Sequence, residues 1–256
     1  MVHPVKWWTP CVLLLVIVVV QAILFLAITQ LATGLDVTPT MDETPTALYR
    51  VAKDAVVFVV LLVVLRRGGR EPRATLRLKW VSPAKMGATC LMVLSLVPWE
   101  MFLWGDRGAE RMMGLGDSIR FNAALVVSWM SGVFLTPVAE ELFFRGFALS
   151  VFGKRSAVAG VLGSCVLFGT YHFSGSVASL IVPLPFALAT AYSVVVTGSV
   201  YPAIVAHAFW NLLAVGADAG LTLPQPTPGW LLLSTVVGGI CACLLLRTYR
   251  TCAQSR

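Results

Sequence analysis

Long runs of apolar residues alternate with short polar stretches along the whole chain, and this pattern predicts a bundle of membrane-spanning helices. About 20 apolar residues are needed to cross the hydrocarbon core of a bilayer as a helix. The runs lack the every-second-residue alternation of a membrane β-strand, and a helix satisfies its backbone hydrogen bonds internally. The expected spans are the eight segments 11–32, 49–65, 86–104, 122–149, 157–173, 177–196, 200–216 and 229–247.

Composition places the chain in the same class. Of its 256 residues, 58% are hydrophobic and only 12% are charged, whereas a soluble domain carries about a quarter charged residues. The first run, 11–32, is about twice the length of a signal-peptide core, so we interpret it as a retained span. No internal repeat or second soluble region is visible. We therefore expect an all-α, polytopic bundle in which residues 1–256 form a single integral membrane domain.

The distribution of charge predicts how the chain is oriented. Much of the excess behind the net charge of +7 lies in the connection 66–85, in Lys154-Arg155 and in the C-terminal tail. The acidic residues gather in the alternate connections, at Asp36, Asp42 and Glu43, at Asp106, Glu110 and Asp117, and at Asp218. This is the positive-inside pattern, which places both termini in the cytoplasm. It predicts the lipid bilayer as a partner and no nucleic acid, in a bacterial plasma membrane or a eukaryotic endoplasmic reticulum.

The run from Glu140 to Arg145 brings three ionisable groups into one of the most apolar stretches of the chain. A charged residue at the centre of a span costs about 2.5–3.5 kcal/mol even on the lenient insertion scale, so such residues usually serve a site or a structural pairing. Two further polar residues, His172 and His207, lie in later apolar segments. Together these residues predict a reaction centre within the membrane.

Helical spacing divides the roles within the fourth segment. Glu141 and Arg145 are four residues apart, which is the spacing of an ion pair on one helix face. Glu140 lies about 140° from Arg145 around the axis. We therefore expect Glu140 to point into a central cavity, where a carboxylate can act as a general base.

The remaining polar residues complete a set suited to amide hydrolysis. Glu140 and His172 can polarise a water molecule between them. His207 and Asn211 are one turn apart on one helix face, from which an imidazole and a carboxamide can donate hydrogen bonds to a developing oxyanion.

Other interpretations of the same residues stay open. An intramembrane histidine often only bonds across helices. The polar cluster would also suit a proton-coupled transporter, a haem held by His172 and His207, or a non-catalytic immunity or scaffold protein that binds a peptide.

Three short motifs lie in order along the chain: EExxxR (Glu140 to Arg145) continuing into Gly146, FxxxH (Phe168 to His172) and HxxxN (His207 to Asn211). In these residues the sequence resembles the CPBP family, the CAAX-prenyl-endopeptidase and bacteriocin-processing intramembrane proteases, over a core of roughly residues 122–216.

The resemblance implies an eight-helix-type core and endoproteolysis of a membrane-associated or lipid-anchored peptide or protein. It implies that Glu140 activates water with His172, and that His207 and Asn211 stabilise the oxyanion. The chain has no HExxH motif, so we expect no cofactor. A zinc ion on Glu140, His172 and His207 is the alternative.

The expected boundaries contain one conflict. Glu140 falls on the cytoplasmic side of the middle of its segment, whereas His172 falls near the outer end of the next. At 1.5 Å per residue, the two would differ in depth by about 10–15 Å.

Overall fold

The protein is a bundle of helices with no strand among the residues that the computed structural model describes, which are 5–34, 44–68, 71–103, 121–218 and 223–254. The helices are α1 (Thr9–Gly34), α2 (Thr44–Arg67), α3 (Pro72–Thr75), α4 (Pro83–Leu94), α6 (Ala123–Met130), α7 (Thr136–Glu141), α8 (Leu149–Phe152), α9 (Ala157–Tyr171), α10 (Val177–Ile181), α11 (Leu184–Thr197), α12 (Tyr201–Asp218) and α13 (Pro228–Gln254). Two π-helical segments, η1 (Ser131–Leu135) and η2 (Leu142–Ala148), join α6, α7 and α8.

Every segment expected from the sequence is helical. Five stretches are long and apolar enough to cross a membrane: Thr9–Ala32, Pro83–Leu103, Ala123–Phe152, Val177–Thr197 and Pro228–Arg250. Two further apolar helices, Ala157–Tyr171 and Tyr201–Gly216, are shorter. The chain is therefore a polytopic, multi-pass membrane bundle, and the full count of eight spans stays a prediction.

Several expected boundaries differ from the structure, most of all at α13, which ends at Gln254 against the expected 247, and at the third segment, which is interrupted at Ser95–Leu96. The second helix begins five residues earlier, at Thr44, and the fourth segment continues to Phe152. The sixth segment divides into α10 and α11 next to Pro183, because a proline cannot donate the backbone hydrogen bond that a continuous helix needs. The acidic residues expected at Asp36, Asp42, Glu43, Asp106, Glu110 and Asp117 lie outside the described residues.

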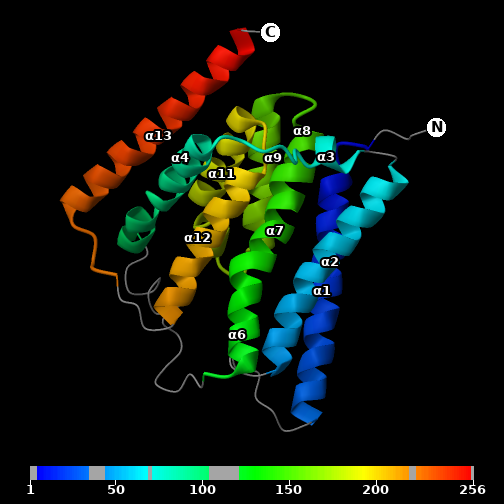
Figure 1. Cartoon of the computed structure of the whole chain (residues 1–256). Coiled ribbons are helices and arrows are strands. Elements are labelled where there is room, and N and C mark those ends of the chain that lie inside the picture. Colours follow the sequence, from blue (N-terminus) through cyan, green and yellow to red (C-terminus); the bar gives the residue numbers. More distant parts are fainter. Residues whose placement is uncertain (1–4, 35–43, 69–70, 104–120, 219–222, 255–256) are drawn as a thin grey trace.

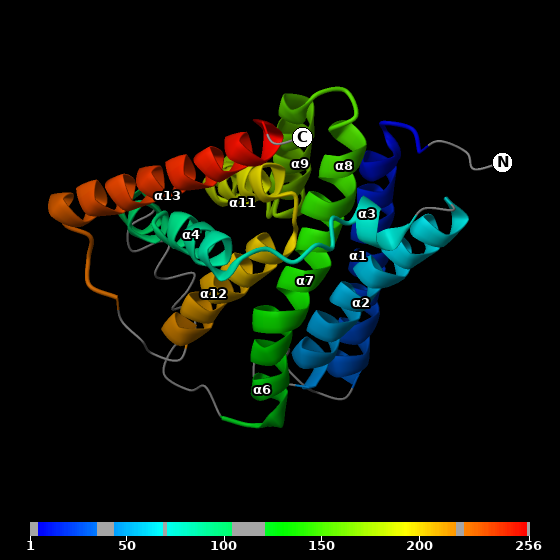
Figure 2. The same cartoon turned by 45° about the horizontal axis from the view of Figure 1, so that its top comes forward.

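The stretch from α6 to α8 forms one long rod through the middle of the bundle (Figure 1). Helices α1 and α2 pack together on one side of the rod, α11 and α12 lie on the other, and α9 packs on η2 between them, in contact with both α1 and α11. Helices α4 and α13 form an outer layer against α11 and α12, which is also visible in Figure 2. The rod is thus enclosed by helices from both halves of the chain.

The rod changes its winding where proline and glycine require it. Segment η1 ends at Leu135, just before Pro137. A proline lacks the N–H and crowds the carbonyl four residues back, and a wider π-turn is one way to absorb that defect. Gly146 lies in η2, where a Cβ would come within 3.2 Å of Leu76 Cδ2 and 3.3 Å of its Cα. The connection after α3 can therefore lie directly on the rod.

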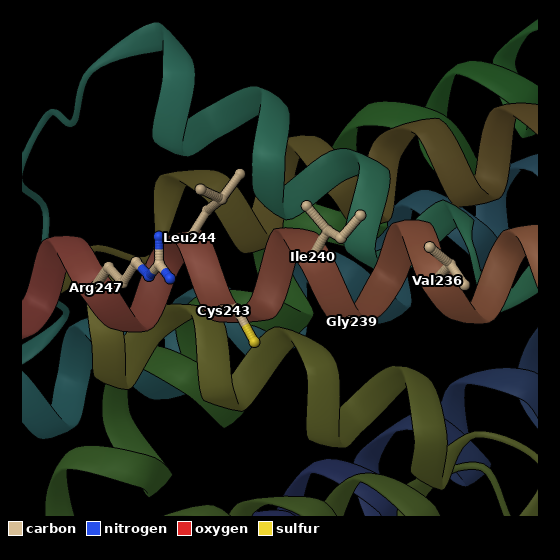
Figure 3. A pocket seen from close by; sticks show the side chains of 6 residues that line it. All are labelled: Val236, Gly239, Ile240, Cys243, Leu244 and Arg247. Carbon is tan, nitrogen blue, oxygen red and sulfur yellow. The ribbon is translucent and has the colours of Figure 1, made fainter.

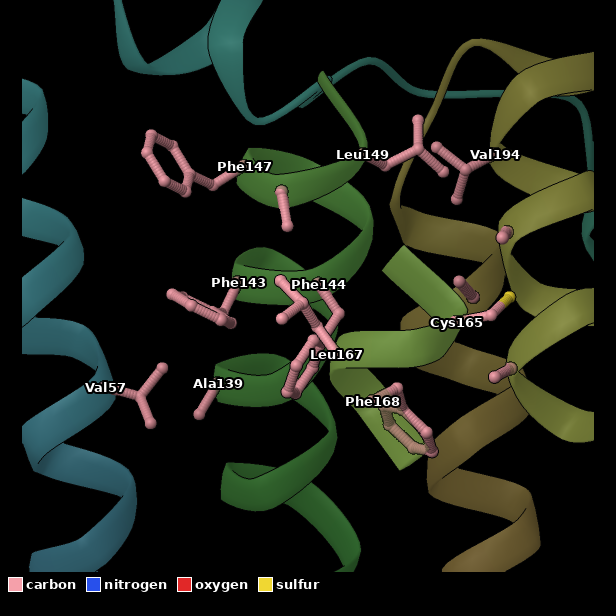
Figure 4. Packing of buried hydrophobic residues seen from close by; sticks show 14 of the residues in the cluster. Val57, Ala139, Phe143, Phe144, Phe147, Leu149, Cys165, Leu167, Phe168 and Val194 are labelled. Carbon is pink, nitrogen blue, oxygen red and sulfur yellow. The ribbon is translucent and has the colours of Figure 1, made fainter. Parts of the chain in front are cut away.

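Aromatic residues fill the centre of the bundle. Phe143, Phe144, Phe147 and Phe168 are almost fully buried and belong to one apolar cluster that joins the rod to α2, α9 and α11 (Figure 4). This packing fixes the position of the rod, and therefore of its charged residues, relative to the neighbouring helices.

The chain ends lie on one side of the bundle. The first turn of α1 and the last turns of α13 lie at the same end as α8 (Figures 1 and 2). Basic residues mark this end, where Arg155 stacks on the ring of Trp7 at 4.7 Å. This arrangement agrees with the orientation predicted from charge, and the cytoplasmic side itself stays a prediction.

The outer surface of α13 carries a shallow groove (Figure 3). It is lined by Val236, Gly239, Ile240, Cys243, Leu244 and Arg247. Val236, Ile240 and Leu244 are exposed apolar side chains, as expected of a helix face that contacts lipid tails.

Candidate active site

Two adjacent carboxylates end α7, in the middle of the rod. Glu140 is 4% exposed and Glu141 is fully buried. Because consecutive helical residues point about 100° apart, the two carboxylates face different neighbours. Glu141 meets His207 of α12, whereas Glu140 faces His172 at the end of α9.

Glu141 is shared between a cation and an imidazole. Its Oε1 accepts a hydrogen bond from His207 Nδ1 at 2.9 Å. Its Oε2 lies 3.3 Å from Arg145 Nε, at the i,i+4 spacing expected from the sequence. The N–H does not point at that oxygen, so this contact is electrostatic rather than a hydrogen bond. The sequence indicated the contact with Arg145, and the structure adds His207 as a second partner.

An aromatic cage surrounds the Arg145 guanidinium. Its Cζ lies 4.1 Å from the ring centre of Phe168, 5.8 Å from Phe144 and 5.9 Å from Phe186. Among the described residues, none of its three nitrogens has a hydrogen-bond partner. Arginine is weakly hydrated and stacks well on aromatic faces, so these rings can stabilise a fully buried cation.

His172 caps the C-terminal end of α9 and is oriented by the backbone of its own helix. Its Nδ1 lies 2.9 Å from the carbonyl oxygen of Phe168. A carbonyl can only accept, so Nδ1 carries the proton and the neutral ring has its lone pair on Nε2. That Nε2 lies 3.9 Å from Oε2 of Glu140, which is beyond hydrogen-bond distance.

The expected difference in depth between Glu140 and His172 was wrong. Both helices meet at the tight turn between Phe152 and Ala157, so depth is measured from that turn. Glu140 lies 12 residues before Phe152, and His172 lies 15 residues after Ala157. The difference of 3 residues is about 4.5 Å along the axis, which tilt and side-chain reach can cover.

Asn211 lies one turn after His207 on α12. Its Nδ2 donates a hydrogen bond of 2.7 Å to the backbone carbonyl of Gly132, in η1. Gly132 lies eight residues before Glu140 on the rod, so this bond is directed away from the pair of Glu140 and His172. The amide keeps one further N–H for another acceptor.

The space beside Glu140 is a narrow, mostly apolar crevice, too tight in this structure to hold a water molecule. It is lined by Leu14, Ile17, Val57, Glu140, Phe143, Phe144 and Tyr171. Oε2 of Glu140 is buried and has no hydrogen-bond partner within the described part of the chain. The expected central cavity is therefore a crevice on the side of α1 and α2.

The zinc alternative stays a prediction. Within the described ranges, no three His, Cys, Asp or Glu side chains lie together as a ready-made set for a metal ion. His207 directs Nδ1 to Glu141, which leaves its Nε2 for another partner. Glu140, His172 and His207 would have to move closer together to act as ligands.

Two polar residues near the site were missed by the sequence reasoning. Asp54 of α2 is fully buried and accepts hydrogen bonds from the rod. Gln21 of α1 donates to the hydroxyl of Tyr171, which lines the crevice beside Glu140. The signal for Asp54 was present, because an acidic residue inside the expected span 49–65 needs a partner for the same reason as Glu140 does.

A helical bundle with two buried carboxylates facing two imidazoles defines a polytopic membrane protein with an internal acid–base cluster. Residues 122–213 match the model of the family "Type II CAAX prenyl endopeptidase Rce1-like". This match confirms the resemblance to CPBP proteins over that segment. The matched segment lies within the expected core 122–216, and the single-domain assignment of residues 1–256 stays a prediction.

A second comparison found a similar curated protein. "Uncharacterized protein YyaK" of Bacillus subtilis (strain 168) is 36% identical over 105 residues, which cover 36% of this chain and 35% of the relative. The match thus spans about a third of the length of that relative. No solved structure matches the chain.

Proposed function

We propose that this protein is an endopeptidase of a bacterial plasma membrane that hydrolyses a peptide bond in a membrane-associated or lipid-anchored substrate. The observation that carries the proposal is the relation between Glu140 and His172. A buried carboxylate oxygen without a hydrogen-bond partner faces an imidazole nitrogen at 3.9 Å. Their segment matches the model of an endopeptidase family.

In the proposed first step, one water molecule contacts both Glu140 Oε2 and His172 Nε2. The carboxylate takes a proton from the water while the oxygen attacks the peptide carbonyl, so a C–O bond forms and the carbonyl oxygen becomes negative. The C–N bond then breaks, and the proton held by Glu140 moves to the leaving nitrogen. Water is consumed, and a carboxylic acid and an amine are released, which become a carboxylate and an ammonium group when the acid passes its proton to the amine.

His207 and Asn211 are the proposed oxyanion donors. Glu141 holds Nδ1 of His207, so only Nε2 is available to the substrate. When protonated, that nitrogen donates a hydrogen bond, and Glu141 balances the imidazolium charge. Asn211 keeps one N–H after its bond to Gly132. The charges of the site then balance, because Arg145 and the protonated His207 are positive and the two glutamates are negative. An apolar environment favours such neutrality.

The experiment that tests the proposal compares peptide termini in membranes from cells that carry the native protein, Glu140→Gln or Glu71→Gln. Glu71→Gln is the control, because it makes the same chemical change at a residue that lies in an exposed connection before α3. We expect new termini with the native protein and with Glu71→Gln, and none with Glu140→Gln at matched membrane levels. Equal termini in all three samples would contradict the role of Glu140. No terminus in any sample, with every protein inserted, would favour a transport or binding protein instead.

A further inference from the structure

A second buried polar cluster lies directly below Glu140, between α2 and the rod. Asp54 is fully buried, and its Oδ2 accepts hydrogen bonds from Thr136 Oγ1 at 2.7 Å and from Ser131 Oγ at 3.2 Å. Lys53 balances the charge, with Nζ 2.8 Å from Oδ1. Hydroxyl groups that donate to an ionised carboxylate make stronger hydrogen bonds than neutral pairs do.

The two donors lie on either side of the π-helical segment η1. Ser131 is its first residue, and Thr136 is the first residue after it. A serine or threonine inside a helix commonly bonds the carbonyl of the preceding turn. Here both hydroxyls bond to Asp54 of a different helix instead. The carboxylate therefore fixes the wide turn, whose winding sets how the following part of the rod is rotated.

Glu140 lies one turn beyond this anchor. Thr136 and Glu140 are four residues apart and share one face of α7. On α2, Asp54 and Val57 are three residues apart and share the facing side, and Val57 lines the same crevice as Glu140. The contacts form two successive levels along the rod: Asp54 binds Thr136 at the first level, and Val57 lies beside Glu140 at the second.

We propose that Asp54 is a positioning residue that holds Glu140 at the height and rotation at which its carboxylate faces His172. The proposal rests on the function proposed above. Asp54 lies outside the matched segment 122–213, so part of the catalytic geometry is supplied by the N-terminal helices. A shift of about 1 Å in a reacting group can cost on the order of 100-fold in rate. The loss of one hydrogen bond at this anchor is therefore expected to be visible in catalysis.

The test measures the initial rate at which the Glu140-dependent termini appear, per folded protein. Membrane vesicles from host cells that lack the protein supply the substrate. Thr136→Val removes the hydroxyl at nearly constant shape, and Thr136→Ser retains it. We expect a rate reduced by tenfold or more for Thr136→Val and for Asp54→Asn, and within about twofold of native for Thr136→Ser. The double variant Asp54→Asn with Thr136→Val should be no slower than the slower of the two single variants, because the contact between Asp54 and Thr136 is lost only once.

Thr89→Val is the matched control. Thr89 is fully buried, whereas Thr136 is half-buried, and the hydroxyl of Thr89 bonds the carbonyl of Lys85 in its own helix. Melting temperatures are recorded for all variants, and Thr89→Val should keep its rate. A native rate for Thr136→Val, or an equal loss for Thr136→Ser, overturns the role of Asp54 while the proposed function stands. Absence of Glu140-dependent cleavage by the native protein overturns the proposed function, and the role of Asp54 with it.

Discussion

Glu141 and His207 are 66 residues apart in sequence and form a buried hydrogen bond of 2.9 Å between two helices. This bond fixes which imidazole nitrogen carries the proton. The same carboxylate compensates the Arg145 cation at 3.3 Å. Glu141 therefore has a structural task that its neighbour Glu140 does not share, although the two are chemically identical.

Glu141→Gln should destabilise the fold strongly. It leaves the fully buried Arg145 without a counter-charge, and breaking a buried pair in this way typically costs about 3–5 kcal/mol. Glu140→Gln removes a carboxylate without such a cation partner, so its stability should stay close to native. Denaturant titration in detergent, followed by tryptophan fluorescence, measures both. Equal loss in the two variants would show that Glu141 is not the structural member.

Arg145→Lys should also destabilise the protein, even though the charge is kept. A lysine ammonium is compact and strongly hydrated, and it cannot stack its plane on Phe168 as the guanidinium does at 4.1 Å. We expect a loss of about 1–2 kcal/mol, within the range of desolvated cation–π contacts. Denaturant titration measures this loss of unfolding free energy, and Arg73→Lys, at an exposed residue, is the control. A native midpoint for Arg145→Lys would contradict the importance of the cage.

His172→Asn should abolish cleavage while it leaves the fold intact. The asparagine amide lies near the position of Nδ1 and can still donate to the carbonyl of Phe168, but nothing replaces Nε2 beside Glu140. General-base assistance of this kind is worth about 100- to 10,000-fold. Quantification of the Glu140-dependent termini gives the rate, and the melting temperature gives the fold. A rate within tenfold of native would remove His172 from the mechanism.

Gly146→Ala should loosen the connection after α3 from the rod. The added Cβ would lie 3.3 Å from both Cα and the carbonyl oxygen of Leu76, so backbone has to move. Overpacking of this kind costs about 1–3 kcal/mol. Gly87→Ala is the control, because nothing lies within 4 Å of its added Cβ and alanine favours a helix interior. Thermal melting compares the two, and equal shifts would contradict a close contact at Gly146.

The sequence predicted the helices well because long apolar runs and proline positions carry that information locally. It placed Glu141 beside Arg145 through helix periodicity alone. It could not predict the π-helical segments η1 and η2: Pro137 signals a defect in the helix, but whether the chain kinks, breaks or widens its turn also depends on neighbours such as Asp54 and Leu76 from elsewhere in the chain.

The sequence predicted part of the site geometry, and the two errors, in the depth of His172 and in the partner of His207, each have a physical cause. The depth of His172 relative to Glu140 was wrong because each segment was centred in the bilayer, whereas the short turn 153–156 sets the register. The hydrogen bond from His207 to Glu141 was missed because periodicity gives no information about which helices face each other. The catalytic roles of Glu140, His172, His207 and Asn211 stay predictions.

The shortness of α9 has a consequence for hydrolysis. Its 15 residues span about 22 Å, less than the roughly 30 Å of a typical hydrocarbon core. His172 is the residue at which this helix ends, and its side chain is 36% exposed whereas that of Glu140 is only 5% exposed. Phe173, Ser174 and Gly175, which follow, are exposed as well. Under the proposed function, this exposed end of α9 is the route by which water reaches Glu140: it passes His172 from the aqueous phase without first dissolving in lipid.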